Sequence, residues 1–146
     1  MSIIHVTDCF LPRLGGIEVQ VAGLAREQAA RGEDVHVVTA TRLASPGDGY
    51  AVHRIAVRLP WDVPVHPRAG SHLDRVIASL SPSVVHVHVG AIAPFAWSGV
   101  RSAARLGVPA VVVVHSMWDP AVRWCYRVLD RVASWSSAGV ALAAVS

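Results

Sequence analysis

Short apolar segments alternate with longer amphipathic segments along the whole chain. Apolar runs of about four to eight residues that are rich in valine and isoleucine are typical of strands, whereas apolar positions that repeat at helical spacing are typical of helices. Runs of the first kind predict strands at residues 3–7, 34–40, 50–57, 84–89, 108–115 and 139–145. Patterns of the second kind predict helices at residues 17–31, 71–80, 95–106 and 120–136.

The order of these elements predicts the fold class. Strands that alternate with helices form right-handed βαβ units, and such units build a mostly parallel sheet with helices on its faces. The run "VPAVVVVH" (residues 108–115) is typical of a strand that is buried on both faces. The sequence therefore predicts an α/β, Rossmann-like, mostly parallel sheet flanked by helices, in one domain of residues 1–146.

Two of the predicted helices carry boundary signals in the sequence. Arg31 lies in the last turn of the first helix and Gly32 directly after it, which is a common way for a helix to end. In the helix predicted at residues 71–80, Ser71 is placed to act as the N-cap and Asp74 to occupy the capping-box position. These signals predict where each helix begins or ends.

Parallel sheets bind ligands beyond the carboxyl ends of their strands, and Gly15 and Gly16 lie in such a position. A helix N-terminus exposes unpaired N–H groups and the positive end of the helix dipole. A phosphate or carboxylate can bind there if no Cβ atom intrudes, and a glycine pair meets that condition. A loop that needs a positive φ angle is the alternative explanation of the two glycines, and their spacing alone slightly favours it.

Several of the eight histidines also lie at or near strand ends. His86 and His88 are two residues apart on a strand, so their side chains share a face. A metal site would need a third ligand that no nearby motif supplies, which favours one packed histidine and one at the strand tip. His115 ends the valine-rich run, where it is either a contact for a hydroxyl or phosphate group or a hydrogen-bonded structural residue.

Composition excludes several functional classes. The net charge is +3, and all 13 basic residues are scattered arginines, so no basic run indicates nucleic-acid binding. Without lysine there is no P-loop, and the glycine pair does not fit the GxGxxG pattern of dinucleotide sites. Cys9 and Cys125 form no CxxC motif. No signal peptide and no apolar stretch near ~20 residues is present, which predicts a cytoplasmic protein.

Arg123, Arg127 and Arg131 are spaced four residues apart in the helix predicted at residues 120–136. Side chains at this spacing lie on one face and form a basic stripe. A solvated helix face is the simpler interpretation of the stripe. The alternative is peripheral contact with an anionic membrane surface, which would place the protein at the inner face of the membrane.

Four segments in order resemble the N-terminal domain of family-4 glycosyltransferases, which are retaining enzymes of the GT-B fold. The segments are "FLPRLGGIEVQVAGLAREQAARGEDVHVVTA" (residues 10–40), "VVHVH" (84–88), "VPAVVVVHSMW" (108–118) and "AAVS" (143–146). The resemblance implies transfer of a hexose from a nucleotide-diphosphate sugar to an acceptor hydroxyl, with no metal cofactor. It also implies that this chain is the acceptor-side half of such an enzyme, without the C-terminal nucleotide-sugar domain.

The resemblance implies roles for individual residues. Gly15 and Gly16 match the glycine loop near the donor diphosphate and the acceptor. His115 matches the histidine that contacts the donor sugar near the reacting centre, and His88 matches a further position in the cleft. The alternative function is a non-catalytic α/β ligand-binding module with an anion site at Gly15 and Gly16.

Overall fold

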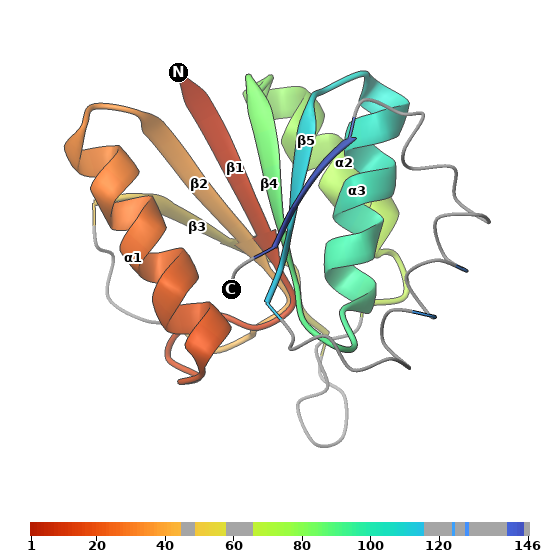
Figure 1. The fold of residues 1–146 in the computed structure, drawn as a ribbon. Helices are drawn as coiled ribbons and strands as arrows, with labels where there is room; N and C mark the ends of the chain where they lie inside the picture. The colour runs from red at the N-terminus through yellow and green to blue at the C-terminus, as the bar shows by residue number, and fades with distance from the viewer. Residues whose placement is uncertain (45–48, 58–65, 116–123, 125–127, 129–139, 145–146) are drawn as a thin grey trace.

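The structure is a computed structural model that describes residues 1–44, 49–57, 66–115, 124, 128 and 140–144 (Figure 1). In chain order, the described elements are β1 (Ser2–Thr7), α1 (Gly16–Ala30), β2 (Asp34–Thr39), β3 (Ala51–Arg54), α2 (Ala69–Leu80), β4 (Val84–Val89), α3 (Pro94–Leu106), β5 (Ala110–Val114) and β6 (Val140–Ala144). No helix among these is both long enough and apolar enough to cross a membrane. The arginine stripe of Arg123, Arg127 and Arg131 lies outside the described residues and stays a prediction.

The strands form one sheet in the order β3-β2-β1-β4-β5-β6. Every neighbouring pair in this sheet is parallel, so the predicted Rossmann-like fold is confirmed and the described sheet is parallel throughout. The chain leaves β1 toward β2 on one side, while β4 pairs with the other side of β1. The strand order therefore reverses between β1 and β4, which is where such sheets bind ligands.

The helices pack on both faces of the sheet (Figure 1). On one face, α1 covers β2 through a core of buried residues, namely Phe10, Val21, Ala22, Ala25, Val35 and Val37. On the other face, α2 and α3 pack against alternate residues of the same sheet. Leu73 and Ile77 of α2 and Phe95 and Val100 of α3 share this core with the strand residues Ile4, Val6, Val85 and Val87. Helix α3 comes so close to β1 that a Cβ atom at Gly99 would lie 2.8 Å from Cγ1 of Val6.

The start of α2 corrects one sequence prediction. The helix begins at Ala69, after Arg68 as the N-cap residue, and no side chain caps it. Ala69 is buried against the core, so packing extends the helix two residues before Ser71. Asp74 does not cap this helix either, because its carboxylate accepts hydrogen bonds of 2.8 and 3.0 Å from the Arg105 guanidinium of α3.

The valine-rich strand corrects a second prediction. Its residues alternate in burial: Ala110, Val112 and Val114 are buried, but Val111 and Val113 are only half-buried. Within the described part of the chain, β5 is therefore fully covered on the α2 and α3 face alone. The strand predicted at residues 50–57 is also shorter, since β3 ends at Arg54.

Candidate functional site

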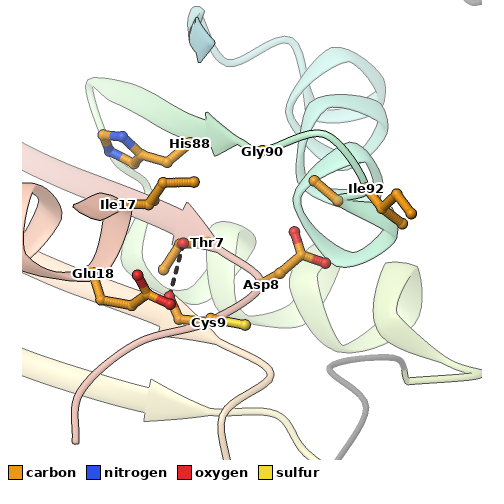
Figure 2. A pocket seen from close by; sticks show the side chains of 9 residues that line it. Thr7, Asp8, Cys9, Ile17, Glu18, His88, Gly90 and Ile92 are labelled. Atoms are coloured by element: carbon orange, nitrogen blue, oxygen red, sulfur yellow. Dashed lines mark hydrogen bonds between the residues drawn. The ribbon is translucent and has the colours of Figure 1, made fainter. Parts of the chain in front are cut away.

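A small pocket of about 100 Å³ opens at the carboxyl ends of β1 and β4, where the strand order reverses (Figure 2). Its walls come from the end of β1, the first turn of α1 and the loop between β4 and α3. The lining residues are Thr7, Asp8, Cys9, Ile17, Glu18, His88, Gly90, Ile92 and Ala93. The fold thus brings three separate segments with polar groups to one place.

The loop after β1 is tied to the neighbouring strands before it enters α1. Phe10 is fully buried, and its N–H donates a 2.8 Å hydrogen bond to Oγ1 of Thr41. The guanidinium of Arg54 donates to the carbonyl groups of Leu11 and Thr41 at 2.9 and 3.1 Å. These contacts fix the path of the loop and thereby the position of the first turn of α1 beside the pocket.

The glycine pair lies at the N-terminus of α1. Gly15 is the N-cap residue, with φ −164° and ψ 171°, and Gly16 is the first helical residue. Neither glycine has a positive φ angle, so the explanation that the loop needs one is wrong. A Cβ atom at Gly16 would meet no described atom within 4 Å, which leaves the space in front of this residue open.

Glu18 explains why glycine is needed at position 15. The side chain of Glu18 is only 8% exposed and folds back across Gly15. A Cβ atom at Gly15 would overlap the Glu18 carboxylate and lie 3.0 Å from its Cδ atom. A carboxylate in the first turn of a helix interacts favourably with the helix dipole. In this structure the chain's own carboxylate therefore lies where the sequence predicts an anion.

Asp8 joins the end of β1 to the start of α3. One carboxylate oxygen accepts a 2.9 Å hydrogen bond from the N–H of Phe95, and the other accepts a 3.1 Å bond from the N–H of Ala96. Asp8 is 7% exposed, and burial raises its pKa from 3.8 to about 6, although the two N–H groups act in the opposite direction. The pocket thus contains a carboxyl group that can exchange a proton close to neutral pH.

His5 of β1, His88 of β4 and His115, which directly follows β5, form a hydrogen-bonded row with two glutamines of α1. We call this row the histidine chain. Nδ1 of His5 lies 2.9 Å from Nε2 of His88, and Nδ1 of His88 lies 3.0 Å from Nε2 of His115. At one end, Nε2 of His5 lies 2.7 Å from Oε1 of Gln28. At the other end, Nδ1 of His115 lies 3.0 Å from Oε1 of Gln20. All six ring nitrogens are therefore hydrogen-bonded.

Burial determines the charge of the histidine chain. His5 is 0% exposed and His88 is 3% exposed. Loss of water lowers the pKa of His5 from 6.5 to about 4 and the pKa of His88 from 6.5 to about 2. His115 is half-buried, and burial lowers its pKa as well. At neutral pH the three rings are therefore neutral, and each carries a single N–H group.

The structure also supplies the third histidine that His86 and His88 lack in the sequence. The register of β1 and β4 pairs His5 with His86, and one ring nitrogen of each of the three histidines lies within 4.8 Å of the others. Three imidazoles can bind Zn²⁺. However, Nδ1 of His5 and Nε2 of His88 already hydrogen-bond each other at 2.9 Å. This arrangement favours a proton, rather than a metal ion, between His5 and His88.

The predicted site residues lie in one neighbourhood. His88 lines the pocket, and Gly15 and Gly16 directly precede two of its lining residues on α1. His115 does not line the pocket but hydrogen-bonds His88 and α1. Of the pair His86 and His88, the sequence predicts one packed histidine and one at the strand tip. The packed one is His88, which lies nearer the end of β4. Which of these residues contact a substrate stays a prediction.

Sequence analysis did not single out His5, Asp8 or Glu18. Asp8 and Glu18 both lie close to the ligand-binding edge, and a polar residue directly after a strand is a usable signal. His5 carries no such signal, because its role depends on β4, which lies about eighty residues further along the chain.

Comparison with known protein families gives a match over most of the chain. The model of Glycosyltransferase Family 4 matches residues 14–144. A comparison with curated proteins found no match.

Two solved structures of low sequence identity share the fold, and a third superposes less closely. The SsfS6 glycosyltransferase from Streptomyces sp. SF2575 superposes with a TM-score of 0.52 and 14% identity, over 93% of this chain and 46% of that chain. Phenylacrylic acid decarboxylase from Aquifex aeolicus superposes with a TM-score of 0.50 and 13% identity, over 99% of this chain and 81% of that chain. The calicheamicin glycosyltransferase CalG4 gives a TM-score of 0.42 and 17% identity, over 92% of this chain and 42% of that chain. This chain thus spans less than half the length of the SsfS6 glycosyltransferase.

Proposed function

Because this chain belongs to glycosyltransferase family 4, we propose that it forms the acceptor-side domain of a retaining glycosyltransferase. The enzyme moves a hexose from a nucleotide-diphosphate sugar to a hydroxyl group of an acceptor. The observation that carries the proposal is the position of the pocket, which opens beside the N-terminus of α1 at the point where the strand order reverses. This is the place where α/β sheets bind phosphorylated ligands.

The N-terminus of α1 suits the leaving diphosphate. Backbone N–H groups at Gly16 and the residues after it point out of the helix end, and the space that a Cβ atom of Gly16 would occupy is open. The Glu18 carboxylate, which folds across Gly15, has to move aside when the diphosphate binds there. As the glycosidic bond breaks, negative charge develops on the diphosphate and the sugar becomes oxocarbenium-like. Fixed N–H donors stabilise that developing charge more than they stabilise the ground state.

His115 suits the sugar side of the reaction. Its ring lies beside the first turns of α1, since it hydrogen-bonds Gln20, and it follows β5 at the ligand-binding edge. His88 hydrogen-bonds the inner nitrogen of His115 and fixes the ring orientation. We expect His115→Ala to lower kcat/KM by about tenfold to a hundredfold, mostly through kcat, because one hydrogen bond near the reacting centre is lost.

The test is glycosyl transfer by the polypeptide that the whole gene encodes. The protein is incubated with uridine, guanosine and thymidine diphosphate hexoses, and released nucleotide is measured with and without an alcohol acceptor. The proposal expects turnover of one donor class, with an unchanged anomeric configuration in the product by proton NMR. An inverted product would refute retention, and tight binding of a donor without any turnover would support the non-catalytic binding module instead.

The isolated chain of residues 1–146 is the control for this assay. We expect it to show no measurable transfer and only weak affinity for a nucleotide sugar, because the family's nucleotide pocket belongs to the other domain. Micromolar binding of a nucleotide sugar to residues 1–146 in a calorimeter would contradict this division of roles.

A further inference from the structure

The histidine chain contains more hydrogen bonds than three neutral imidazole rings can donate. Its two ends face Oε1 atoms of Gln28 and Gln20, and an amide oxygen only accepts hydrogen bonds. The four hydrogen bonds need four N–H groups, whereas three neutral rings supply three. Either one ring carries a second proton, or one glutamine amide turns and donates its NH2 group.

Burial and exposure decide between these possibilities. A second proton on His5 or His88 would place a charge among buried groups, which desolvation opposes. Gln20 is exposed, so its amide can turn by 180° and present its NH2 group to His115. Gln28 is only half-exposed and makes the shortest bond of the row, 2.7 Å to His5. The amide that turns is therefore Gln20, at the outer end.

This choice fixes the direction of every hydrogen bond in the row. Nε2–H of His5 donates to Gln28, Nε2–H of His88 donates to His5, and Nε2–H of His115 donates to His88. All Nδ1 atoms are then acceptors. We propose that His5 and His88 are positioning residues that hold His115 in its neutral Nε2–H tautomer, with the Nδ1 lone pair facing outward.

The histidine chain does not conduct protons through the sheet. Its inner end is the amide of Gln28, which takes up no proton at any physiological pH. Its effect is confined to the outer ring, where Nδ1 of His115 accepts a hydrogen bond and has none to donate. The histidine chain therefore sets the tautomer of His115, as hydrogen-bond partners set the tautomer of other functional histidines.

The tautomer selects the chemical group that His115 can bind, and this part of the inference rests on the proposed function. A deprotonated phosphate oxygen only accepts hydrogen bonds, so it finds no donor on neutral His115. A hydroxyl group of the sugar or the acceptor can donate to Nδ1 and replace the amide of Gln20. Phosphate oxygens suit the N–H groups at the start of α1 instead.

The test determines the tautomer of each ring in the ligand-free chain at pH 7. In protein labelled with nitrogen-15, NMR spectra that correlate ring nitrogens with carbon-bound protons separate the Nε2–H, Nδ1–H and doubly protonated forms. We expect the Nε2–H form for His5, His88 and His115, in about tenfold excess or more, because the other form breaks a buried hydrogen bond. An Nδ1–H or doubly protonated His115 would overturn the proposal.

Two substitutions at position 88 test whether the partner sets the tautomer. His88→Asn keeps an acceptor oxygen close to the position of Nδ1, so His115 is expected to stay in the Nε2–H form. His88→Leu removes the acceptor, and His115 is expected to become a mixture of both forms. Equal tautomer ratios in these two variants, each with a cooperative melting curve, would refute the role of His88.

Gln20→Ala covers the case in which His88→Leu does not fold, because Gln20 is exposed and its loss leaves the core intact. The proposal expects an unchanged His115 tautomer in this variant, and a change would show that Gln20 sets it. Binding of one equivalent of Zn²⁺ that is lost in His86→Ala would also overturn the proposal, since a metal ion would then separate His5 from His88. None of these measurements uses glycosyl transfer, so a failed transfer assay leaves this result standing.

Discussion

Asp8→Asn tests whether desolvation makes the ionised carboxylate of Asp8 unfavourable in the folded chain, despite its hydrogen bonds to the start of α3. The carboxyl group holds its proton more tightly in the folded chain, where its pKa is about 6, than in the unfolded chain, where it is 3.8. Folding stability from this group is therefore greatest below about pH 4 and falls as the pH rises toward 6. The full difference amounts to about 3 kcal/mol, of which about 1.3 kcal/mol falls between pH 5 and pH 7.

The measurement is the free energy of unfolding by urea at pH 5, 6 and 7, for the unmodified chain and for Asp8→Asn. Buried histidines with lowered pKa values, such as His5, act in the opposite direction, because they resist the protons that the unfolded chain takes up. Both proteins contain these histidines, so their contribution cancels in the difference. We expect the unmodified chain to lose about 1.3 kcal/mol relative to Asp8→Asn over this range.

Asp8→Ala provides the matched control. Asparagine still accepts a hydrogen bond from Phe95 or Ala96, whereas alanine leaves both buried N–H groups without an acceptor. Asp8→Ala should therefore be less stable than Asp8→Asn by about 1 kcal/mol or more at every pH. If the free energy of unfolding of the unmodified chain stays constant relative to Asp8→Asn, the N–H groups offset desolvation fully and the reasoning is refuted. If the unmodified chain instead gains stability relative to Asp8→Asn as the pH rises, the N–H groups outweigh desolvation.

Three further substitutions follow from the packing. Gly16→Val should leave the melting temperature nearly unchanged, since its Cβ atom meets no described atom within 4 Å. It should lower kcat/KM of the whole enzyme about a hundredfold, or about 3 kcal/mol, because the side chain blocks the diphosphate. Normal transfer by this variant would show that the diphosphate does not bind at Gly16. Gly99→Ala should destabilise the chain by about 1–3 kcal/mol in urea unfolding, because its Cβ atom would lie 2.8 Å from Cγ1 of Val6. An unchanged urea midpoint would mean that α3 shifts away from β1 without cost. Asp74→Ala should cost less than about 1 kcal/mol, because its pair with Arg105 is solvent-exposed, and a larger loss would reveal a coupled network.

Local patterns were sufficient to predict the architecture of this domain. Valine-rich runs separated by amphipathic segments predict alternating strands and helices, and handedness rules convert that order into a parallel sheet. The ligand-binding edge follows from the same order, which is why Gly16 and His88 could be placed near one another before the structure. Each of these inferences depends on residues close together in the sequence.

The misplaced start of α2 and the unrecognised roles of Asp8 and His5 depend on contacts between distant segments. Ser71 is not a cap because Ala69 is buried and starts the helix earlier. Asp8 caps a helix that begins more than eighty residues later, and His5 finds its partner at a similar separation. Neither contact leaves a periodic trace in the sequence, since each needs only one polar residue at the correct register. The hydrogen-bonded His115, by contrast, was one of two interpretations that the sequence left open.

The position of Glu18 has a consequence for the strength of anion binding. Its carboxylate lies across Gly15, so an anion that binds at the start of α1 has to displace it first. The apparent affinity equals the intrinsic affinity multiplied by the fraction of molecules in which Glu18 has already moved away. If that fraction were about one in a hundred, a ligand would bind about a hundredfold more weakly than its own contacts allow. Inorganic phosphate, which has few contacts, would then bind about a hundredfold more weakly still, while a larger ligand could offset this loss through further contacts.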